Sequence, residues 1–422
     1  MTRGWVWWSR REGALLALLC LAAGIVFMVS GGLPWLGSWK MALDWSSGSA
    51  ILVGPVVAGL AAWRYSKITA VGLDVLAAQS VRGARAWLAP AAALWSLACA
   101  VVLLVALVTT SLTLTHGSVT APRQAVILVL AGSALAAQVL LGAFVGTRFP
   151  GPWAPPVSAA LVFSLGMFSS VGAIPETFRT GGVTSSLVGQ GYVGRTLLAQ
   201  AAVALALAAI LLYAVRARIA PTASRALGAV TAIAVLVGAA CWVGGPATGE
   251  RYRFVPAPLV CDDRGRPEVC MARETRRPLH AVAEALRAAA APLRDARVDL
   301  PERWVQDVPG RRHPAGAGVL RFVDIGETRA RADRDAVLWS LGAPADCAAF
   351  RGYDAPPAAL QAQSLLVRWL GLAADPGRSD GGDVDTWLLS AEGETWAART
   401  YAGLASCSLD ELQVPPVADR GW

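Results

Sequence analysis

The stretch Ala226–Gly245 reads ALGAVTAIAVLVGAACWVGG and is the last long apolar run in a chain of 422 residues. As a helix that rises about 1.5 Å per residue, such a run is about as long as the hydrocarbon core of a bilayer is thick. The residues before it carry 13 Arg and 2 Lys against 4 acids, a net charge of +11, and those after it carry 22 Arg against 25 acids, a net charge of −3. If the run crosses a membrane, it decides on which side the last 177 residues lie.

The composition is typical of an integral membrane protein. Hydrophobic residues make up 55% of the chain and charged residues 16%, whereas soluble domains carry about a quarter charged residues. The basic excess belongs to the apolar half, where basic residues flank spans, so it is no argument for nucleic acid. The only lysines, Lys40 and Lys67, follow Trp39 and Ser66. A nucleotide-binding P-loop needs Gly-Lys followed by Ser or Thr, so the sequence contains none.

The apolar runs predict an all-α polytopic membrane protein with seven transmembrane helices, followed by a small, mainly α extracytoplasmic domain over 246–422. The expected spans are 13–30, 48–63, 87–109, 124–146, 155–174, 196–215 and 226–245.

Basic residues predict the orientation, because loops on the cytoplasmic side are rich in Arg and Lys. With the N-terminus inside, eleven basic residues are cytoplasmic: Arg3, Arg10, Arg11, Arg64, Lys67, Arg82, Arg85, Arg148, Arg216, Arg218 and Arg225. Four are exterior: Lys40, Arg123, Arg179 and Arg195. Seven crossings then place the C-terminal domain outside the cell membrane.

Cysteine placement agrees with this topology. Cys20, Cys99 and Cys241 lie in expected spans, where Cys behaves as a small buried hydrophobe. The other four lie in the polar region and allow three connectivities, of which we expect Cys261–Cys270 and Cys347–Cys407. Disulfides persist in oxidising compartments, as outside a bacterial membrane.

The exterior region is expected to be rich in helices. Arg277–Ala291 has an apolar face, a helix starts at Pro356–Pro357 and runs to Gly371, and Ser390 caps a helix through Leu404. Val319–Ile325 alternates weakly as a strand does. Leu259–Pro267 and Asp375–Asp385 are expected as loops.

The expected spans contain no Asp, Glu, Lys, Arg or His. Ion-coupled transporters usually keep ionisable residues near the midplane, so self-powered transport is disfavoured. Gln138 and Gln200 are expected to make interhelical hydrogen bonds. Gly142 and Gly146, four residues apart, permit close helix packing.

Catalytic and metal-binding motifs are weak, and we expect no enzyme, no cofactor and no metal. GRSDG at 377–381 has nucleophile-elbow spacing around Ser379, but no histidine follows it. His280 on its helix is expected to be a surface or packing residue. Asp380, Asp383 and Asp385 lack EF-hand spacing and are expected to form a solvated turn.

A cytoplasmic connector, Arg64–Trp87, carries an apolar edge beside basic residues. The residues are Arg64, Lys67, Ile68, Val71, Val75, Leu76, Arg82 and Arg85. One interpretation is an interfacial helix on anionic headgroups; the other is a helix that docks a cytoplasmic partner.

Residues 1–218 resemble, in layout, the permease subunit of a bacterial export-type ABC transporter. That family has six spans that start and end inside and a cytoplasmic helix between the second and third spans. The resemblance implies a separate ATPase subunit and pairing with a second permease copy, in the lipid bilayer.

The exterior part, with CDDRGRPEVC at 261–270 and WLLSAEGETW at 387–396, resembles domains of uncharacterised actinobacterial membrane proteins. The added seventh span and exterior domain depart from the six-span pattern. The alternative function is a membrane-anchored extracytoplasmic receptor or scaffold without transport.

Overall fold

The computed structural model describes residues 2–30, 35–36, 38–79, 83–115, 122–170, 179–182, 187–217, 224–308, 311, 313–321, 334–343 and 355–415. The side chains of residues 2–13, 84–85, 224–226 and 334 are not described. The chain divides into two compact units, of which the first holds residues 1–115 and 119–253 and the second holds 254–422.

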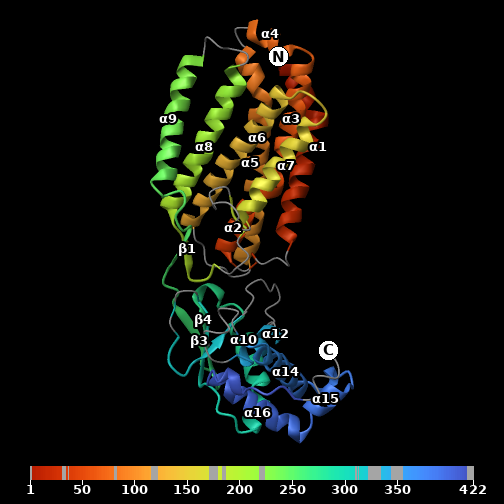
Figure 1. Cartoon of the computed structure of the whole chain (residues 1–422), viewed down its shortest axis with the longest axis vertical. Coiled ribbons are helices and arrows are strands. Elements are labelled where there is room, and N and C mark those ends of the chain that lie inside the picture. Colours follow the sequence, from red (N-terminus) through yellow and green to blue (C-terminus); the bar gives the residue numbers. More distant parts are fainter. Residues whose placement is uncertain are drawn as a thin grey trace. The chain divides into compact units, whose positions relative to one another are not determined.

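The first unit is a bundle of helices that run alternately up and down (Figure 1). Its elements are α1 (Thr2–Val29), α2 (Trp39–Gly48), α3 (Ala50–Ala70), α4 (Leu73–Gln79), α5 (Gly83–Thr115), the 3-10 turn η1 (Pro122–Ala125), α6 (Val126–Arg148), α7 (Ala154–Ser170), β1 (Gln190–Tyr192), α8 (Gly194–Ala217) and α9 (Ser224–Val243). Strand β1 pairs with β2 (Tyr252–Phe254). Figure 1 places α4 and the start of α1 at one end of the bundle and β1 at the other.

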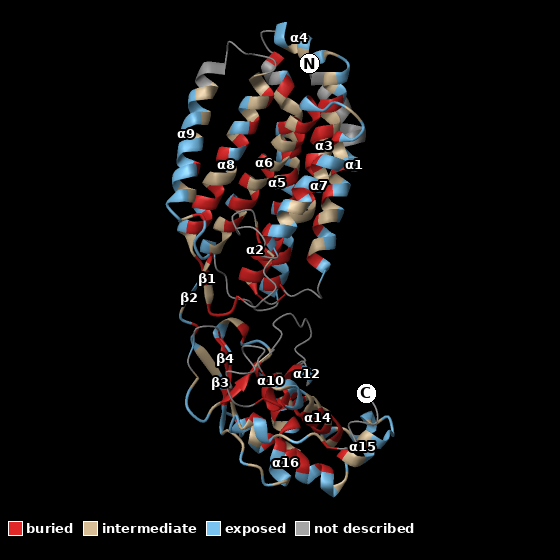
Figure 2. Cartoon of the chain, viewed as in Figure 1, coloured by how far each residue is buried: buried red, intermediate tan, exposed pale blue. Residues whose placement is uncertain are grey.

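Four helical segments among the described residues are long and apolar enough to cross a membrane: Trp39–Ala70, Ala86–Thr115, Pro122–Arg148 and Gly194–Ala217. Three further apolar helices, Ala14–Val29, Ala154–Ser170 and Leu227–Val243, are shorter. The Trp39–Ala70 segment is the central one, since 72% of its most apolar stretch is buried, against 39–44% in the other three. Figure 2 shows the contrast between buried α3 and largely exposed α9.

Small residues bring α3 and α6 into close contact, as the Gly142–Gly146 spacing predicts. A Cβ atom on Gly142 would lie 2.1 Å from the Ala58 carbonyl oxygen, and one on Gly146 would lie 2.3 Å from the Ala62 carbonyl oxygen. Only glycine allows the two backbones to approach this closely. The expected hydrogen bond of Gln138 is not found: its Oε1 is buried without a partner among the described residues.

The candidate span Trp39–Ala70 contains charged residues that the expected bounds 48–63 leave out. The second expected span, 48–63, begins nine residues too late, because the helix starts at Trp39 and includes Lys40 and Asp44. The two side chains are 7% and 0% exposed. Helices α2 and α3 form one rod of 32 residues with a local break at Ser49.

The second unit combines helices with a mixed four-stranded sheet in the order β3-β4-β5-β6. The strands are β3 (Leu259–Asp262), β4 (Glu268–Ala272), β5 (Arg303–Gln306) and β6 (Gly318–Leu320). Strand β3 is antiparallel to β4, and β4, β5 and β6 are parallel. Fully buried Trp304 packs over Gly318, where a Cβ would lie 2.5 Å from the indole. The loop predicted for Leu259–Pro267 is therefore wrong at β3. Of the strand predicted over Val319–Ile325, Val319 and Leu320 lie in β6, Arg321 does not, and 322–325 lie outside the described residues.

Helices cover this sheet and form most of the second core. They are η3 (Arg273–Thr275), α10 (Leu279–Ala289), α11 (Ala291–Asp295), α12 (Arg334–Leu341), α14 (Pro357–Ala374), η4 (Pro376–Arg378), α15 (Asp383–Leu388), α16 (Ala391–Ala405) and η5 (Leu409–Glu411). The three predicted helices are confirmed as α10, α14 and α16. Ser390 caps α16, since its Oγ accepts a hydrogen bond from the Gly393 N–H. The proline at the start of α14 occupies the first turn, where no N–H is needed.

Candidate functional site

The most unusual feature of the bundle is the carboxylate of Asp44, which is completely buried in α2. Its Oδ1 accepts hydrogen bonds from the hydroxyls of Tyr192 (2.7 Å) and Tyr252 (3.2 Å). Its Oδ2 accepts the N–H of Gly182 at 2.8 Å. These three donors replace the hydrogen bonds to water that the buried carboxyl group has lost. Ionisable residues in membrane helices are rare and usually functional, so Asp44 is the centre of the candidate site.

Glycines allow the chain to approach Asp44. A Cβ on Gly181 would lie 2.2 Å from the Asp44 carbonyl oxygen, and one on Gly48 would lie 2.6 Å from the Gly182 nitrogen. Gly182 has a φ of +79°, which glycine adopts without strain. Ser47 Oγ donates to the Thr180 carbonyl beside this contact. The segment 180–182 is thus packed directly on α2.

Basic residues lie in the same network. Lys40, one turn before Asp44, donates from Nζ to the carbonyl oxygens of Leu187 (3.0 Å) and Gln190 (2.7 Å). Leu187 lies just before β1 and Gln190 is the first residue of β1, so Lys40 holds the start of this strand against α2.

Arg251 joins the network to α8. It is 2% exposed and donates from Nε to Gln200 Oε1 at 2.8 Å and from Nη2 to the Arg179 carbonyl oxygen. Gln200 Nε2 donates in turn to the Ala247 carbonyl at 2.9 Å. The interhelical hydrogen bond predicted for Gln200 is therefore not found among the described residues, because both of its partners, Ala247 and Arg251, follow α9.

The two tyrosines remain hydroxyl donors under all ordinary conditions. Burial raises the pKa of Tyr192 well above its usual value, and the neighbouring charge of Asp44 raises it further. The same two causes, in the same order, raise the pKa of Tyr252. A protonated phenol can donate to the carboxylate, and an ionised one would repel it.

This hydrogen-bond network can hold several segments together at one end of the bundle. We call Asp44 and its partners Tyr192, Tyr252 and Gly182 the Asp44 lock. It connects α2 with 179–182, with the β1–β2 pair and, through Arg251, with α8. Separating these segments would require the Asp44 carboxylate to lose its donors inside a protein interior, which is costly unless other donors replace them. Hydropathy could not find the site, because the sequence around Asp44 is too polar to resemble the core of a span.

The residues of the predicted docking helix lie at the opposite end of the bundle. Arg64, Lys67 and Ile68 belong to the last turns of α3, and Lys67 Nζ lies 3.8 Å from the ring centroid of Trp63. Val71, Val75 and Leu76 are 70%, 57% and 61% exposed. Arg82 and the side chain of Arg85 lie outside the described residues. The connector thus contains a separate helix of only 7 residues, α4.

Other apolar side chains are exposed at this end. Phe149 and Trp153, in the turn between α6 and α7, are 70% and 77% exposed. The turn is tied to α3, since the Gly151 N–H donates to Ser66 Oγ at 2.7 Å. Aromatic residues in such positions are typical of the interface between a membrane and water.

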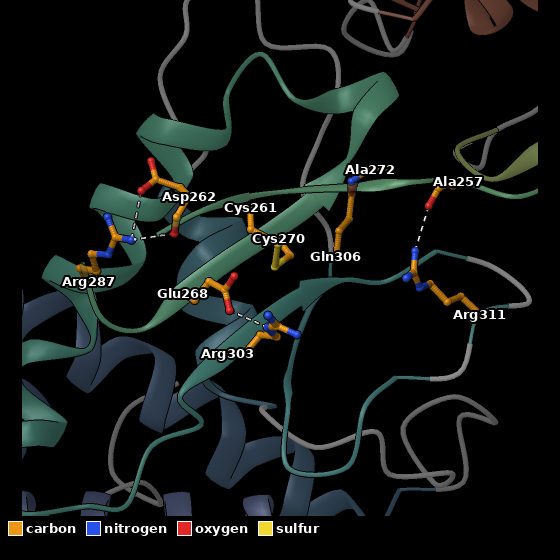
Figure 3. Close-up of a disulfide and its surroundings, with 10 residues drawn as sticks. All are labelled: Ala257, Cys261, Asp262, Glu268, Cys270, Ala272, Arg287, Arg303, Gln306 and Arg311. Atoms are coloured by element: carbon orange, nitrogen blue, oxygen red, sulfur yellow. Dashed lines mark hydrogen bonds and ion pairs between the residues drawn. A yellow bond between two sulfur atoms is a disulfide. The ribbon is translucent and has the colours of Figure 1, made fainter. Parts of the chain in front are cut away.

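In the second unit, the predicted Cys261–Cys270 disulfide is present and joins directly paired residues of β3 and β4 (Figure 3). Cys407 is also disulfide-bonded; its predicted partner, Cys347, lies outside the described residues.

Cys261, Glu268 and Cys270 lie close enough to hold a metal ion as free ligands, but the disulfide removes both thiolates, and Glu268 contacts Arg303 at 2.6 Å. With the disulfide formed, this cluster therefore has too few free ligand atoms to bind a metal ion.

His280 and Asp262 are hydrogen-bonded to each other beside the disulfide. His280 Nδ1 lies 2.9 Å from Asp262 Oδ2, and its Nε2 lies 3.1 Å from Glu284. The two carboxylates thus contact opposite nitrogens of one ring and do not converge on a common metal position. Arg287 donates to the side chain and carbonyl of Asp262 and to the carbonyls of Gly265 and Pro267. It holds the loop that the disulfide closes (Figure 3).

The acidic run near Ser379 is structural in part. Asp385 is 1% exposed and accepts from Arg368 Nε at 2.5 Å, so the prediction of a solvated turn is wrong for this residue. Asp380 accepts from the same guanidinium at 3.1 Å. Ser379 lies between η4 and α15, and its Oγ accepts the Gly381 N–H at 3.2 Å. Ser379 therefore lies in a turn and not between a strand and a helix, as a nucleophile elbow requires.

No protein family, no curated protein and no solved structure matches this chain.

Proposed function

We propose that the chain is an integral membrane protein that works as a permease-like transport component, driven by a separate ATPase subunit that docks at α4. The rod α2–α3 is the observation that carries this proposal. One end of the rod leads into α4, with its exposed Val75 and Leu76, and the other end holds Asp44. A displacement at α4 therefore has a direct mechanical route to the Asp44 lock.

Close packing supports transmission along this route. The α3–α6 contact at Gly142 and Gly146 has no room for sliding without a clash of backbones, so α3 moves as a unit with its neighbour. At the start of α5, a Cβ on Gly83 would lie 1.7 Å from the Ala77 carbonyl oxygen, so α4 is tightly joined to α5 as well. The sequence has no P-loop of its own, which is why the energy source is assigned to a partner.

We also propose that α1, α7 and α9 cross the membrane, which makes seven crossings with the N-terminus inside and the second unit outside. The excess of arginine at the α4 end supports this orientation. The Cys261–Cys270 disulfide supports an oxidising compartment for the second unit.

Membrane-impermeant maleimide, applied to intact cells after mild reduction, should label Cys261 and Cys270. Labelling only after the cells are opened would refute the orientation.

Co-purification tests the transport proposal. The tagged full chain, extracted in mild detergent from its native cells, should bring down a P-loop ATPase subunit. The variant Val71→Ala/Val75→Ala/Leu76→Ala should lose that subunit. A matched variant on the exposed face of α9, Val230→Ala/Leu236→Ala/Val237→Ala, should retain it. Recovery of no ATPase with the wild-type chain, or equal recovery with both variants, would refute the proposal.

A second candidate is a receptor or scaffold whose helices only anchor the second unit. The separate core of the second unit, built around Trp304, Leu366 and Tyr401, favours a domain with a binding role of its own. The two functions differ in one result: the α4 variant should leave the cellular phenotype of a scaffold unchanged and should abolish that of a permease.

A further inference from the structure

The second unit contains an open cavity of about 620 Å³ whose walls are Phe254–Pro258, Val308 and Arg311. Ligand sites in proteins are usually cavities of about 300–1,000 Å³ with mostly apolar walls and a few placed polar groups. Figure 3 shows one side of this region, where Arg311 extends from the loop after β5 to Ala257.

Two of the five residues in the Phe254–Pro258 wall are prolines, which reduces the number of hydrogen-bond donors. Pro256 and Pro258 have no N–H. The carbonyl of Ala257 accepts from Arg311 Nη1 at 2.8 Å, and that of Pro258 accepts from the Arg273 N–H at 2.8 Å. Two carbonyl oxygens of the wall are therefore already hydrogen-bonded, and exposed Phe254 adds a large apolar side chain. Such a wall favours an apolar ligand segment.

Arg311 provides the polar group. A guanidinium has five N–H donors, and within the described residues Arg311 makes one hydrogen bond, to Ala257. The only acid between residues 307 and 313 is Asp307, and it contacts His313 Nε2 at 3.1 Å. Arg311 thus places a positive charge at the edge of an apolar cavity, and that charge matches a carboxylate or phosphate group.

We propose that this cavity binds an amphiphilic anion, with its apolar chain along Phe254–Pro258 and its anionic oxygens on Arg311. A free fatty acid and the headgroup of an anionic phospholipid share this chemistry. The proposal goes beyond transport, and it holds whether or not an ATPase docks at α4.

Photolabelling of the full chain in phosphatidylcholine nanodiscs tests the site. The probe is a diazirine-bearing palmitic acid, and the matched probe is the alcohol of the same chain. The acid should label the peptide that contains 254–258 at least about tenfold more strongly than the alcohol, because a charge-assisted hydrogen bond contributes about 1.5–3 kcal/mol. Arg311→Gln should lower acid labelling to the level of the alcohol, whereas Arg311→Lys should retain part of it. Arg399→Gln, on the exposed face of α16, should have no effect.

A competition arm identifies the source of the anion. If phosphatidylglycerol in the nanodiscs displaces the acid probe in the wild-type chain, the ligand is a membrane phospholipid. If it does not, the ligand is a free fatty acid. Equal labelling by acid and alcohol, or labelling that survives Arg311→Gln in a chain that remains folded, would overturn the proposal.

Discussion

The hydroxyl of Tyr192 donates a 2.7 Å hydrogen bond to Oδ1 of Asp44 across 148 positions of sequence. This bond attaches the strand before α8 to the helix that begins the central rod of the bundle. Tyr252 adds a longer bond to the same oxygen, from 208 positions away. Three distant segments therefore depend on one buried carboxylate, and the lock should respond measurably to the loss of any one partner.

Removal of the Tyr192 hydroxyl should destabilise the first unit. Tyr192→Phe deletes a buried hydrogen bond to a charged group, which contributes about 1.5–3 kcal/mol, while Tyr252→Phe should cost less because its bond is longer. Asp44→Asn should cost more than either, since an amide presents N–H groups to donors that need an acceptor. The melting temperature in detergent measures the order. Tyr213→Phe on α8, whose side chain is 36% exposed, is the control. A Tyr192→Phe protein with the same melting temperature as the control would show that this hydrogen bond contributes nothing to stability.

Alanine at Gly142 or Gly146 should separate α3 from α6. The added methyl group would meet a backbone carbonyl at 2.1 Å or 2.3 Å, and overpacking of this kind costs about 1–3 kcal/mol. Gly132→Ala on the same helix is the matched control, because its Cβ would lie 3.8 Å from Cys99 Sγ. The yield of folded protein, measured by size-exclusion chromatography, should fall for Gly142→Ala and Gly146→Ala. It should stay at the wild-type level for Gly132→Ala. Equal yields for the three variants would contradict close packing at the glycine pair.

Local patterns predicted the helices well and the Asp44 site not at all. The apolar face of α10 and the Ser390 cap depend on residues three or four positions apart, which a single sequence displays. The partners of Asp44 come from 138, 148 and 208 positions away, so its burial has no local signal. Strands β4, β5 and β6 have 5, 4 and 3 residues and pair in parallel through distant chain segments. Strands this short are too brief to show a clear alternation of apolar and polar residues.

The Asp262 carboxylate should make the second unit sensitive to acid. Burial would raise the pKa of Asp262, but hydrogen bonds from His280, the Arg264 N–H and Arg287 outweigh it and hold the pKa below its usual value of 3.8. A carboxyl whose pKa is lower in the folded state contributes stability above its unfolded pKa and loses it as the pH falls through the folded pKa.

Hydrogen exchange of the peptide 259–272, corrected for intrinsic rates, measures this contribution. Between pH 5 and pH 3 (a window about one unit either side of the usual carboxyl pKa) protection should fall more in the wild-type chain than in Asp262→Asn. Asp410→Asn, at an exposed position in η5, should behave as wild type. Parallel acid profiles for wild type and Asp262→Asn would contradict the role of this ion-pair network.

Loss of the Cys261–Cys270 disulfide should loosen the same loop. The bond closes a loop with a sequence separation of 9, and the chain-entropy model assigns about 2–3 kcal/mol to a loop of this size. Cys261→Ser/Cys270→Ser should therefore speed hydrogen exchange in 259–272 while leaving α3 and α6 unchanged. Arg287, which donates to three carbonyls of the loop, gives a second way to loosen it. Arg287→Ala should add to the effect of the double serine variant, because the side chain holds the folded loop whereas the disulfide restricts the unfolded chain. Cys241→Ser, at a free cysteine in α9, is the control. If the double serine variant exchanges no faster than this control, the clamp by Arg287 alone accounts for the order of the loop.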